Sequence, residues 1–238
     1  MAGKPRQNKA NRPRKRTAAR PATAKQAVRR TRAEGDSPYH HGALRDALLQ
    51  AAEKLLERDG LPGLTLRAVA REAGVSHAAP THHFGDLTGL LSELAAIGYT
   101  RFNAAMIAAN ASGTLQQRGM ASAKAYVAYA QAHPGMYGLM FRTERLDMER
   151  PSLHQAASSS FAGFVRSVGA SRHEHIEAEA LSLDQAGAIV RAWSLVHGFT
   201  MLLLDDRLSD VLRRLPKGTT VDQLFEAMLK SLAPRPQA

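Results

Sequence analysis

The 238-residue sequence has no cysteine, one tryptophan and only 5% aromatic residues. The lack of cysteine excludes disulfides, thiolate metal ligands and a cysteine nucleophile, and it is typical of cytosolic proteins. No apolar run approaches the roughly eighteen residues that a membrane-spanning helix needs, so we expect no membrane partner. Segments with the alternating pattern of a strand are missing as well. These absences predict a soluble, cytoplasmic protein of the all-α class.

Acidic residues are absent from one end of the chain. Residues 1–33 hold twelve Lys and Arg and no Asp or Glu, and the remainder holds 20 basic against 21 acidic residues, so the net charge of +11 belongs to this arm. Few apolar residues besides alanine occur there, which predicts a disordered basic arm over residues 1–36. The arm lacks the apolar core of a secretory signal. A solubilising extension, a nuclear signal or a transit peptide has a similar composition, and we favour an arm that contacts DNA phosphates.

Two short helices joined by a glycine are predicted between Thr65 and Phe84. Thr65 is a good N-cap for the first helix, whose apolar residues form one buried stripe: Leu66, Val69, Ala70 and Ala73. Gly74 follows where a sharp turn requires the left-handed conformation, and Ser76 is placed to cap the second helix. That helix has almost no large apolar residue before Phe84, so it presents a polar face. Such a helix suits the major groove of DNA, and the pattern predicts a helix-turn-helix.

The sequence on both sides of this pair predicts further helices. One begins after Pro38 and ends at Gly60, and Asp86 caps a long helix that runs toward Ile107. Beyond a break at residues 110–113, helical spacing, helix-opening prolines and capping boxes predict helices over these ranges: 115–132, 134–141, 151–168, 183–204 and 221–232.

The predicted helix over residues 183–204 carries more apolar residues than one buried face needs. Ile189 and Trp193 lie on one side while Val190 and Leu202 lie elsewhere, so the helix must be covered on more than one face. A second copy of the chain is the expected cover, because a two-fold dimer would also place two DNA-reading heads on a palindromic site. A helix buried in the chain's own core remains the alternative.

Several segments resemble a known family of bacterial regulators. Within residues 39–95, the resemblance to the N-terminal DNA-binding domain of TetR-type regulators is carried by HGALRDALLQAAEKLLERDG, LTLRAVAREAGVS and HHFGDLTGLLSEL. Two later segments resemble a C-terminal domain of that family that is known for a Trp, His and Gly signature: AYVAYAQAHPGMYGLMF and RAWSLVHGFTMLLLDDRL. The resemblance implies a three-helix helix-turn-helix domain over residues 37–98 and a helical ligand-binding and dimerisation domain over residues 99–233.

The resemblance also implies a function. Proteins of this type are all-helical homodimers in which the last two long helices of each copy pack as a four-helix bundle, and most are repressors that a small molecule releases from DNA. Two positions depart from the family pattern, because Thr81 stands where relatives usually carry a tyrosine and Leu87 where they often carry a lysine. Both usual residues touch phosphate, so each loss is expected to weaken DNA anchoring by about 1 kcal/mol.

The candidate DNA contacts lie in the helix-turn-helix, and the alternative for them is a solvated helix face. They are Thr65, Arg67, Ser76, His77, Ala78, Thr81, His82 and His83. Adjacent histidines on a helix point in different directions, so His82 and His83 predict no metal site. The segment His173-Glu174-His175 is expected to be an ordinary loop.

Trp193 and His197 stand one turn apart and share a face of their helix. Core packing is the simpler interpretation, with His197 bonded to a backbone carbonyl. The alternative is a small-molecule effector pocket bordered by Met140, Phe141, Trp193 and His197. The sequence offers no nucleophile with a base and no paired carboxylates, so we expect neither catalysis nor a cofactor.

These patterns together predict a sequence-specific, homodimeric transcriptional regulator. We expect a repressor that binds a palindromic operator, responds to a small-molecule effector and works in the cytoplasm in association with the nucleoid. The alternative is a non-specific architectural protein that binds nucleic acid through its basic arm.

Overall fold

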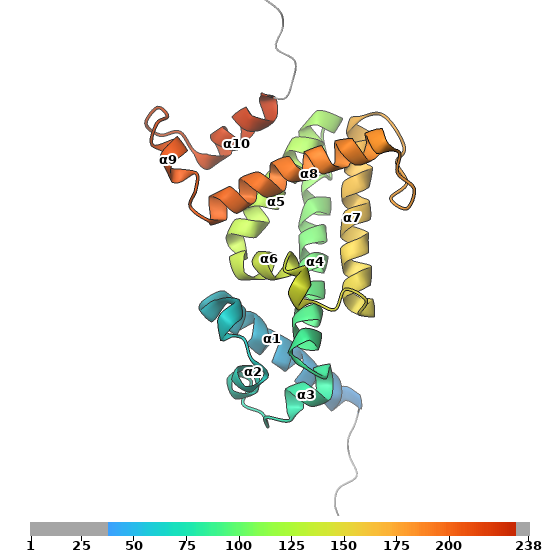
Figure 1. Ribbon diagram of the computed structural model, residues 1–238, viewed down its shortest axis with the longest axis vertical. Coiled ribbons are helices and arrows are strands. Elements are labelled where there is room, and N and C mark those ends of the chain that lie inside the picture. The colour runs from blue at the N-terminus through green and yellow to red at the C-terminus, as the bar shows by residue number, and fades with distance from the viewer. Residues whose placement is uncertain (1–37, 232–238) are drawn as a thin grey trace, which may run out of the picture. The chain divides into compact units, whose positions relative to one another are not determined.

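Helices make up all of the regular secondary structure in residues 38–231, the part of the chain that the computed structural model describes. The predicted all-α class is confirmed. The basic arm predicted for residues 1–36 lies outside the described residues, as does the segment 232–238. We call residues 38–95 the head and residues 96–231 the C-terminal half. In chain order the elements in Figure 1 are α1 (Pro38–Gly63), α2 (Leu66–Glu72), α3 (Ala79–Phe84), α4 (Leu87–Ala109), α5 (Leu115–Ala132), α6 (Pro134–Met140), the 3-10 turn η1 (Thr143–Arg145), α7 (Pro151–Ser171), α8 (Leu183–Leu204), α9 (Ser209–Leu212) and α10 (Val221–Lys230).

One face of α1 organises the core of the head. It buries Leu48, Ala52 and Leu55 in the same hydrophobic cluster as residues of α2, α3 and α4. Gly60 has a φ of 68°, a left-handed conformation that favours glycine, and it interrupts the helix where the sequence predicted its end. The bounds of α1 reach further because a short helical turn containing Pro62 follows the kink.

The corner between α2 and α3 follows the sequence signals in part. Thr65 caps α2, since its Oγ1 accepts a hydrogen bond from the N–H three residues on (3.1 Å), and Gly74 has the expected positive φ of 68°. The prediction that Ser76 caps the next helix is wrong, because Ser76 is exposed and α3 begins at Ala79 without a side-chain cap. Pro80 lies in the first turn of α3, where its ring presets the helical φ and its missing N–H needs no cap.

Helix α4 joins the two halves without interruption. Asp86 caps it as predicted, with Oδ1 accepting from the N–H of Gly89 (2.8 Å). The helix passes straight through residue 98, where the sequence analysis places the domain boundary, and that division stays a prediction. Figure 1 shows α7 alongside α4, which also contacts α1, α3, α5 and α6. A displacement of α4 would therefore be transmitted to both halves.

The C-terminal half contains the predicted helices with three differences. Pro134 opens α6 as expected, and a capping box of Thr114 with Gln117, which the sequence did not predict, opens α5. Helix α7 continues to Ser171, beyond the predicted residue 168, and its Phe161 is 37% exposed although helical spacing places it with the apolar residues of that helix. The sequence did not predict η1 or α9, because elements of three and four residues are too short to show a helical period.

Helix α8 has the predicted range and capping box, but it corrects an expectation about membranes. Its 18-residue window has a mean hydropathy of 1.4, so by length and composition alone it could cross a bilayer. The sequence analysis missed this because Arg191 interrupts the apolar run while the average stays high. One such helix is weak support for a membrane span, since core helices pass the same test. Only 28% of the window is buried within the chain, and Trp193, expected on the buried side, is 40% exposed.

Candidate nucleic-acid interface

The surface of α2, α3 and the turn between them carries the predicted DNA contacts. All of them are exposed except the half-buried His83: Thr65, Arg67, Ser76, His77, Ala78, Thr81, His82 and His83. Among the described residues, the side chains of Arg67, His77 and Thr81 have no hydrogen-bond or ion-pair partner. These groups are therefore available for phosphate oxygens and base edges.

The six-residue helix α3 is anchored at its C-terminal end. Phe84 is buried in the core of the head, and the guanidinium of Arg45 lies over its ring at 5.7 Å from the centroid. The His83 ring lies between those of His82 and Phe84, with centroid distances of 5.5 and 6.2 Å. Gly85 ends the helix with a φ of 82° and donates its N–H to the carbonyl of Thr81 (2.9 Å). The buried Pro80 and Phe84 thus hold a helix whose Thr81 and His82 side chains are exposed.

The two departures from the family pattern lie in different environments. Leu87 is half-buried and packs against the hydrophobic core, so it contributes to the head's stability at the start of α4. Thr81 is exposed on α3 and has no packing role. A larger side chain at position 81 would therefore meet solvent or DNA.

A polar cluster in the C-terminal half connects three helices. The hydroxyls of Tyr126 on α5 and Tyr137 on α6 lie 3.0 and 2.8 Å from Nδ1 of His197 on α8, and the Tyr137 hydroxyl donates to that of Tyr126 (3.1 Å). The Nδ1 atom of His197 therefore lies within hydrogen-bonding distance of two hydroxyls and not of the expected backbone carbonyl. Burial lowers the pKa of His197 and raises the pKa of Tyr137 to about 12. Helical spacing identifies the two tyrosines only as buried residues, so it could not predict their contact with His197.

Two of the other candidate effector residues lie beside His197. The ring centroids of Phe141 and Trp193 are 4.6 and 6.3 Å from that of the imidazole, and both side chains are partly exposed. Met140 is fully buried, and its carbonyl accepts a hydrogen bond from the hydroxyl of Tyr99 (2.9 Å). The edge of this cluster reaches the surface while its centre is filled by the protein's own side chains.

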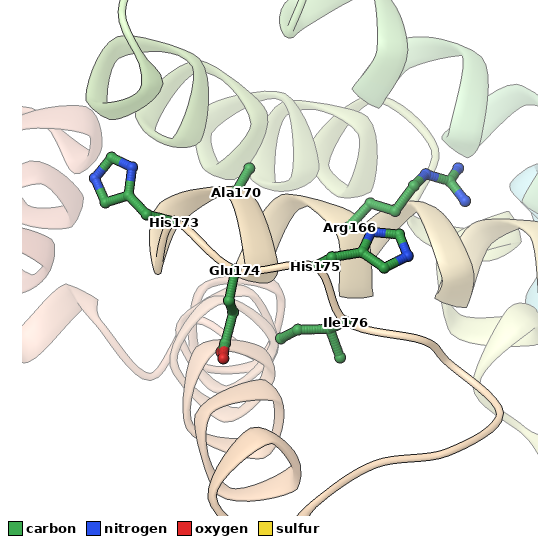
Figure 2. Close-up of a pocket in the computed structure, with 6 residues that line it drawn as sticks. All are labelled: Arg166, Ala170, His173, Glu174, His175 and Ile176. Carbon is green, nitrogen blue, oxygen red and sulfur yellow. The ribbon is translucent and has the colours of Figure 1, made fainter.

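The loop that follows α7 borders a surface pocket of about 320 Å³. Figure 2 shows the imidazoles of His173 and His175 pointing away from one another, with Arg166 on the side of His175. Glu174 pairs with Arg172, and His175 lies 3.0 Å from the glutamate two residues on. Across the described part of the chain, no three His, Asp or Glu side chains converge on a possible metal position. The segment is a loop, as the sequence predicted.

Two family profiles match the chain. Residues 48–94 match the bacterial regulatory proteins of the tetR family, and residues 120–232 match a tetracyclin repressor-like C-terminal domain. The chain belongs to the TetR family. Its helix-turn-helix is accordingly that of a DNA-binding transcriptional regulator.

Solved structures agree with membership of the TetR family. A protein of unknown function from Rhodococcus sp. RHA1 is 34% identical, over 82% of this chain and 96% of that protein, with a TM-score of 0.65. A chain assigned to the TetR family from Rhodococcus sp. is 20% identical over 80% of this chain and 96% of its own, with a TM-score of 0.53. Another, from Streptomyces coelicolor A3(2), is 22% identical over 79% and 80%, with a TM-score of 0.51. The last two structures show only that this chain has the same fold. No curated protein matches the chain.

Proposed function

We propose that this TetR-family chain is a homodimeric repressor that binds a palindromic operator and leaves it when a small molecule binds to the C-terminal half. The observation that carries the proposal is the exposed polar surface of α2 and α3. Arg67, His77 and Thr81 extend from it without partners among the described residues, on a frame fixed by the buried Val69 and Phe84. Rigid placement of unpaired donors and acceptors is what direct reading of DNA requires.

Helix α8 supports the homodimer. Leu183, Val190 and Leu202 are 90%, 58% and 47% exposed, an unusual loss of apolar burial for a helix of this length. Within residues 38–231, a Cβ added at Gly187 or Gly198 would lie more than 4 Å from any atom beyond its own stretch of helix, so the space beside these small residues is open. A second copy packed against α8 would fill that space and cover the apolar side chains. An isologous contact also gives two reading heads related by a two-fold axis, which matches a palindromic operator.

The cluster around His197 supports a small-molecule effector. Aromatic walls from Phe141 and Trp193 surround a few polar groups, the combination that small-ligand sites use. Because the centre is filled, a ligand would enter by displacing Phe141 or Trp193, and this displacement would move α6 or α8. To switch the regulator nearly completely, the ligand must prefer the released state by about 5.5 kcal/mol.

The remaining assignments follow from membership of a family of regulators. We infer that the chain has no catalytic activity and works in the cytoplasm, bound to the nucleoid. A non-specific architectural protein that binds through residues 1–33 is the competing function, since twelve positive charges without an acid would neutralise many phosphates.

Selection from a random duplex pool tests the proposal. The full chain and a variant lacking residues 1–33 are each used to recover DNA at physiological salt, and the recovered duplexes are sequenced. We expect both proteins to enrich the same palindrome, with weaker and less salt-dependent binding by the truncated chain. Uniform recovery by the full chain, together with loss of nearly all binding on truncation, would establish the architectural function instead.

A further inference from the structure

Glu93 on α4 holds two arginines from distant parts of the chain. Its Oε2 accepts a hydrogen bond from Nη2 of Arg45 on α1 at 2.5 Å, and its Oε1 accepts from Nε of Arg150, at the start of α7, at 2.6 Å. The Glu93 side chain is only 12% exposed. Burial alone would raise the pKa of Glu93, but the hydrogen bond from Arg150 and the charge of Arg45 outweigh it and lower that pKa. One ionised carboxylate therefore joins α1, α4 and α7.

The same two arginines reach the end of the recognition helix α3. Arg45 lies over the ring of Phe84, the last residue of α3. On the other side, a Cβ added at Gly89 would collide with the carbonyl oxygen of Phe84 and lie 3.0 Å from Nη1 of Arg150. Glycine is therefore required by the close Phe84 carbonyl, and the Arg150 guanidinium lies beside the same α3–α4 corner. Both guanidinium groups thus contact the corner that positions α3.

The start of α7 is fixed to α4 and, further along, to α8. The buried hydroxyl of Ser92 accepts a hydrogen bond from the N–H of Asp147 (2.8 Å), which places the segment before α7 on the first turns of α4. Toward its other end, α7 buries Val165 and Val168 in one cluster with Ile189 of α8. A continuous set of packed contacts therefore runs from α8 through α7 to Arg150 and the α3–α4 corner.

A second ion pair between α1 and α4 shows what is particular to Glu93. Glu53 and Arg101 pair about two turns further along both helices, but no α7 side chain takes part. Glu93 additionally borders an open pocket of about 500 Å³, so water can reach the ion pairs. Such a partly buried ion pair is weak support for net stability compared with apolar packing, although removal of one partner leaves the other charge uncompensated. The shared carboxylate is therefore better suited to orienting α3 than to stabilising the fold.

We propose that Glu93 and Arg150 are positioning residues that fix the recognition helix α3 relative to α7, so that movements of α7 and α8 change the affinity of the head for DNA. This inference rests on the proposed DNA-binding function. The ordered corner pre-organises α3, and loosening it makes α3 sample orientations that do not fit the groove.

The first test measures the affinity of the full chain for the duplex that selection recovers. We expect Arg150→Gln and Glu93→Gln each to weaken binding about tenfold, which is the effect of losing one charge-assisted hydrogen bond. The double variant should bind no more weakly than either single variant, because the two residues act through one contact. Arg150→Lys keeps the charge and should restore part of the affinity. The matched control Arg101→Gln should change binding by less than about twofold.

Hydrogen exchange provides a readout that needs no DNA. In Arg150→Gln we expect faster exchange in residues 79–91, which span α3 and the corner, and unchanged exchange in residues 120–132 of α5. General destabilisation would accelerate exchange in both segments. If the selection finds no preferred duplex, the proposed function fails, but this exchange experiment still tests the positioning role of Arg150.

Three results would overturn the inference. The first is wild-type affinity and exchange in Arg150→Gln, and the second is an equal loss of affinity in Arg101→Gln. The third concerns α6, whose first N–H groups, those of Gly135 and Met136, donate to the carboxylate of Glu57 on α1 at 3.2 and 3.0 Å. If Glu57→Gln reproduced the loss while Arg150→Gln did not, α6 and not α7 would set the position of the head.

Discussion

In the head, helices α2 and α3 bury Val69 and Phe84 and expose unpaired polar side chains. In the C-terminal half the arrangement differs, because α8 helps to bury a cluster of two hydroxyls and an imidazole while it exposes valine and leucine. The head has the usual distribution of a soluble protein. On α8 of the C-terminal half this distribution is reversed, because the apolar Leu183 is 90% exposed and the polar His197 is half-buried.

The contrast identifies the kind of partner that suits each half. An exposed polar face without internal partners suits a charged, hydrated ligand such as DNA, since its groups lose water but gain phosphates and base edges. An exposed apolar face gains free energy only when another apolar surface covers it. Polar groups in an apolar interior are costly unless paired, so a small molecule that enters the His197 cluster must replace each hydrogen bond that it breaks.

A charge placed on the exposed apolar face of α8 should remove this difference between the two halves, and we expect it to have the largest effect of the changes considered. Val190→Lys would bury an unpaired charge in the proposed dimer contact, which costs about 3 kcal/mol or more and should produce monomers. Sedimentation velocity over a range of concentrations measures the change. Val211, which is 43% exposed but lies outside α8, provides the matched control Val211→Lys. Dimers of equal affinity in both variants would contradict the role of α8.

A tyrosine introduced on α3 should increase the affinity of the head for DNA, with a smaller effect than the charge on α8. Because Thr81 is exposed and unpaired, Thr81→Tyr should add one phosphate hydrogen bond without disturbing packing. We expect about fivefold tighter binding to the selected duplex, corresponding to about 1 kcal/mol. Thr81→Phe supplies the ring without the hydroxyl and serves as the control in the same fluorescence titration. An equal gain from phenylalanine would mean that the phosphate contact is not the cause.

The buried imidazole should give the smallest effect, seen in the pH dependence of stability. Burial lowers the pKa of His197, so as pH falls the unfolded chain binds this proton before the folded chain does. The stability that the neutral imidazole contributes is present above its ordinary pKa of about 6.5 and is lost as pH falls toward the lowered value. Urea unfolding from pH 8 to pH 5 should therefore show a flatter decline for His197→Asn than for the wild type. The same change at the exposed His154 is the control, and parallel curves for His197→Asn and the wild type would argue against a buried neutral imidazole.

Local signals accounted for most of the helices. Thr65, Asp86 and Ser182 cap the helices that the sequence assigned to them, and Gly74 has the positive φ that its place in the turn required. Each signal works through hydrogen bonds or sterics within a few residues. Ser76 does not cap α3, because the helix begins at Ala79, three residues further on, with Pro80 in its first turn.

Long-range side-chain contacts could not be predicted in the same way. Glu93 lies 48 and 57 residues from the two arginines that it binds, and His197 lies 71 and 60 residues from its tyrosines. Helical periodicity assigns such residues to a buried or exposed face but does not say which helices meet. Trp193 illustrates this limit, since its spacing predicted burial and it is 40% exposed.

The sequence by itself determined the all-α class, the helix-turn-helix and the family resemblance, because these depend on periodicity, capping and turn chemistry within one or two helical turns. The same patterns predict which side chains contact DNA. Only the tertiary structure decided that Glu93 joins α1 to α7, that two hydroxyls converge on His197 and that α8 leaves an apolar face uncovered. Those contacts arise from how whole helices pack against one another. Packing depends on the combined shape of many side chains, which no local pattern encodes.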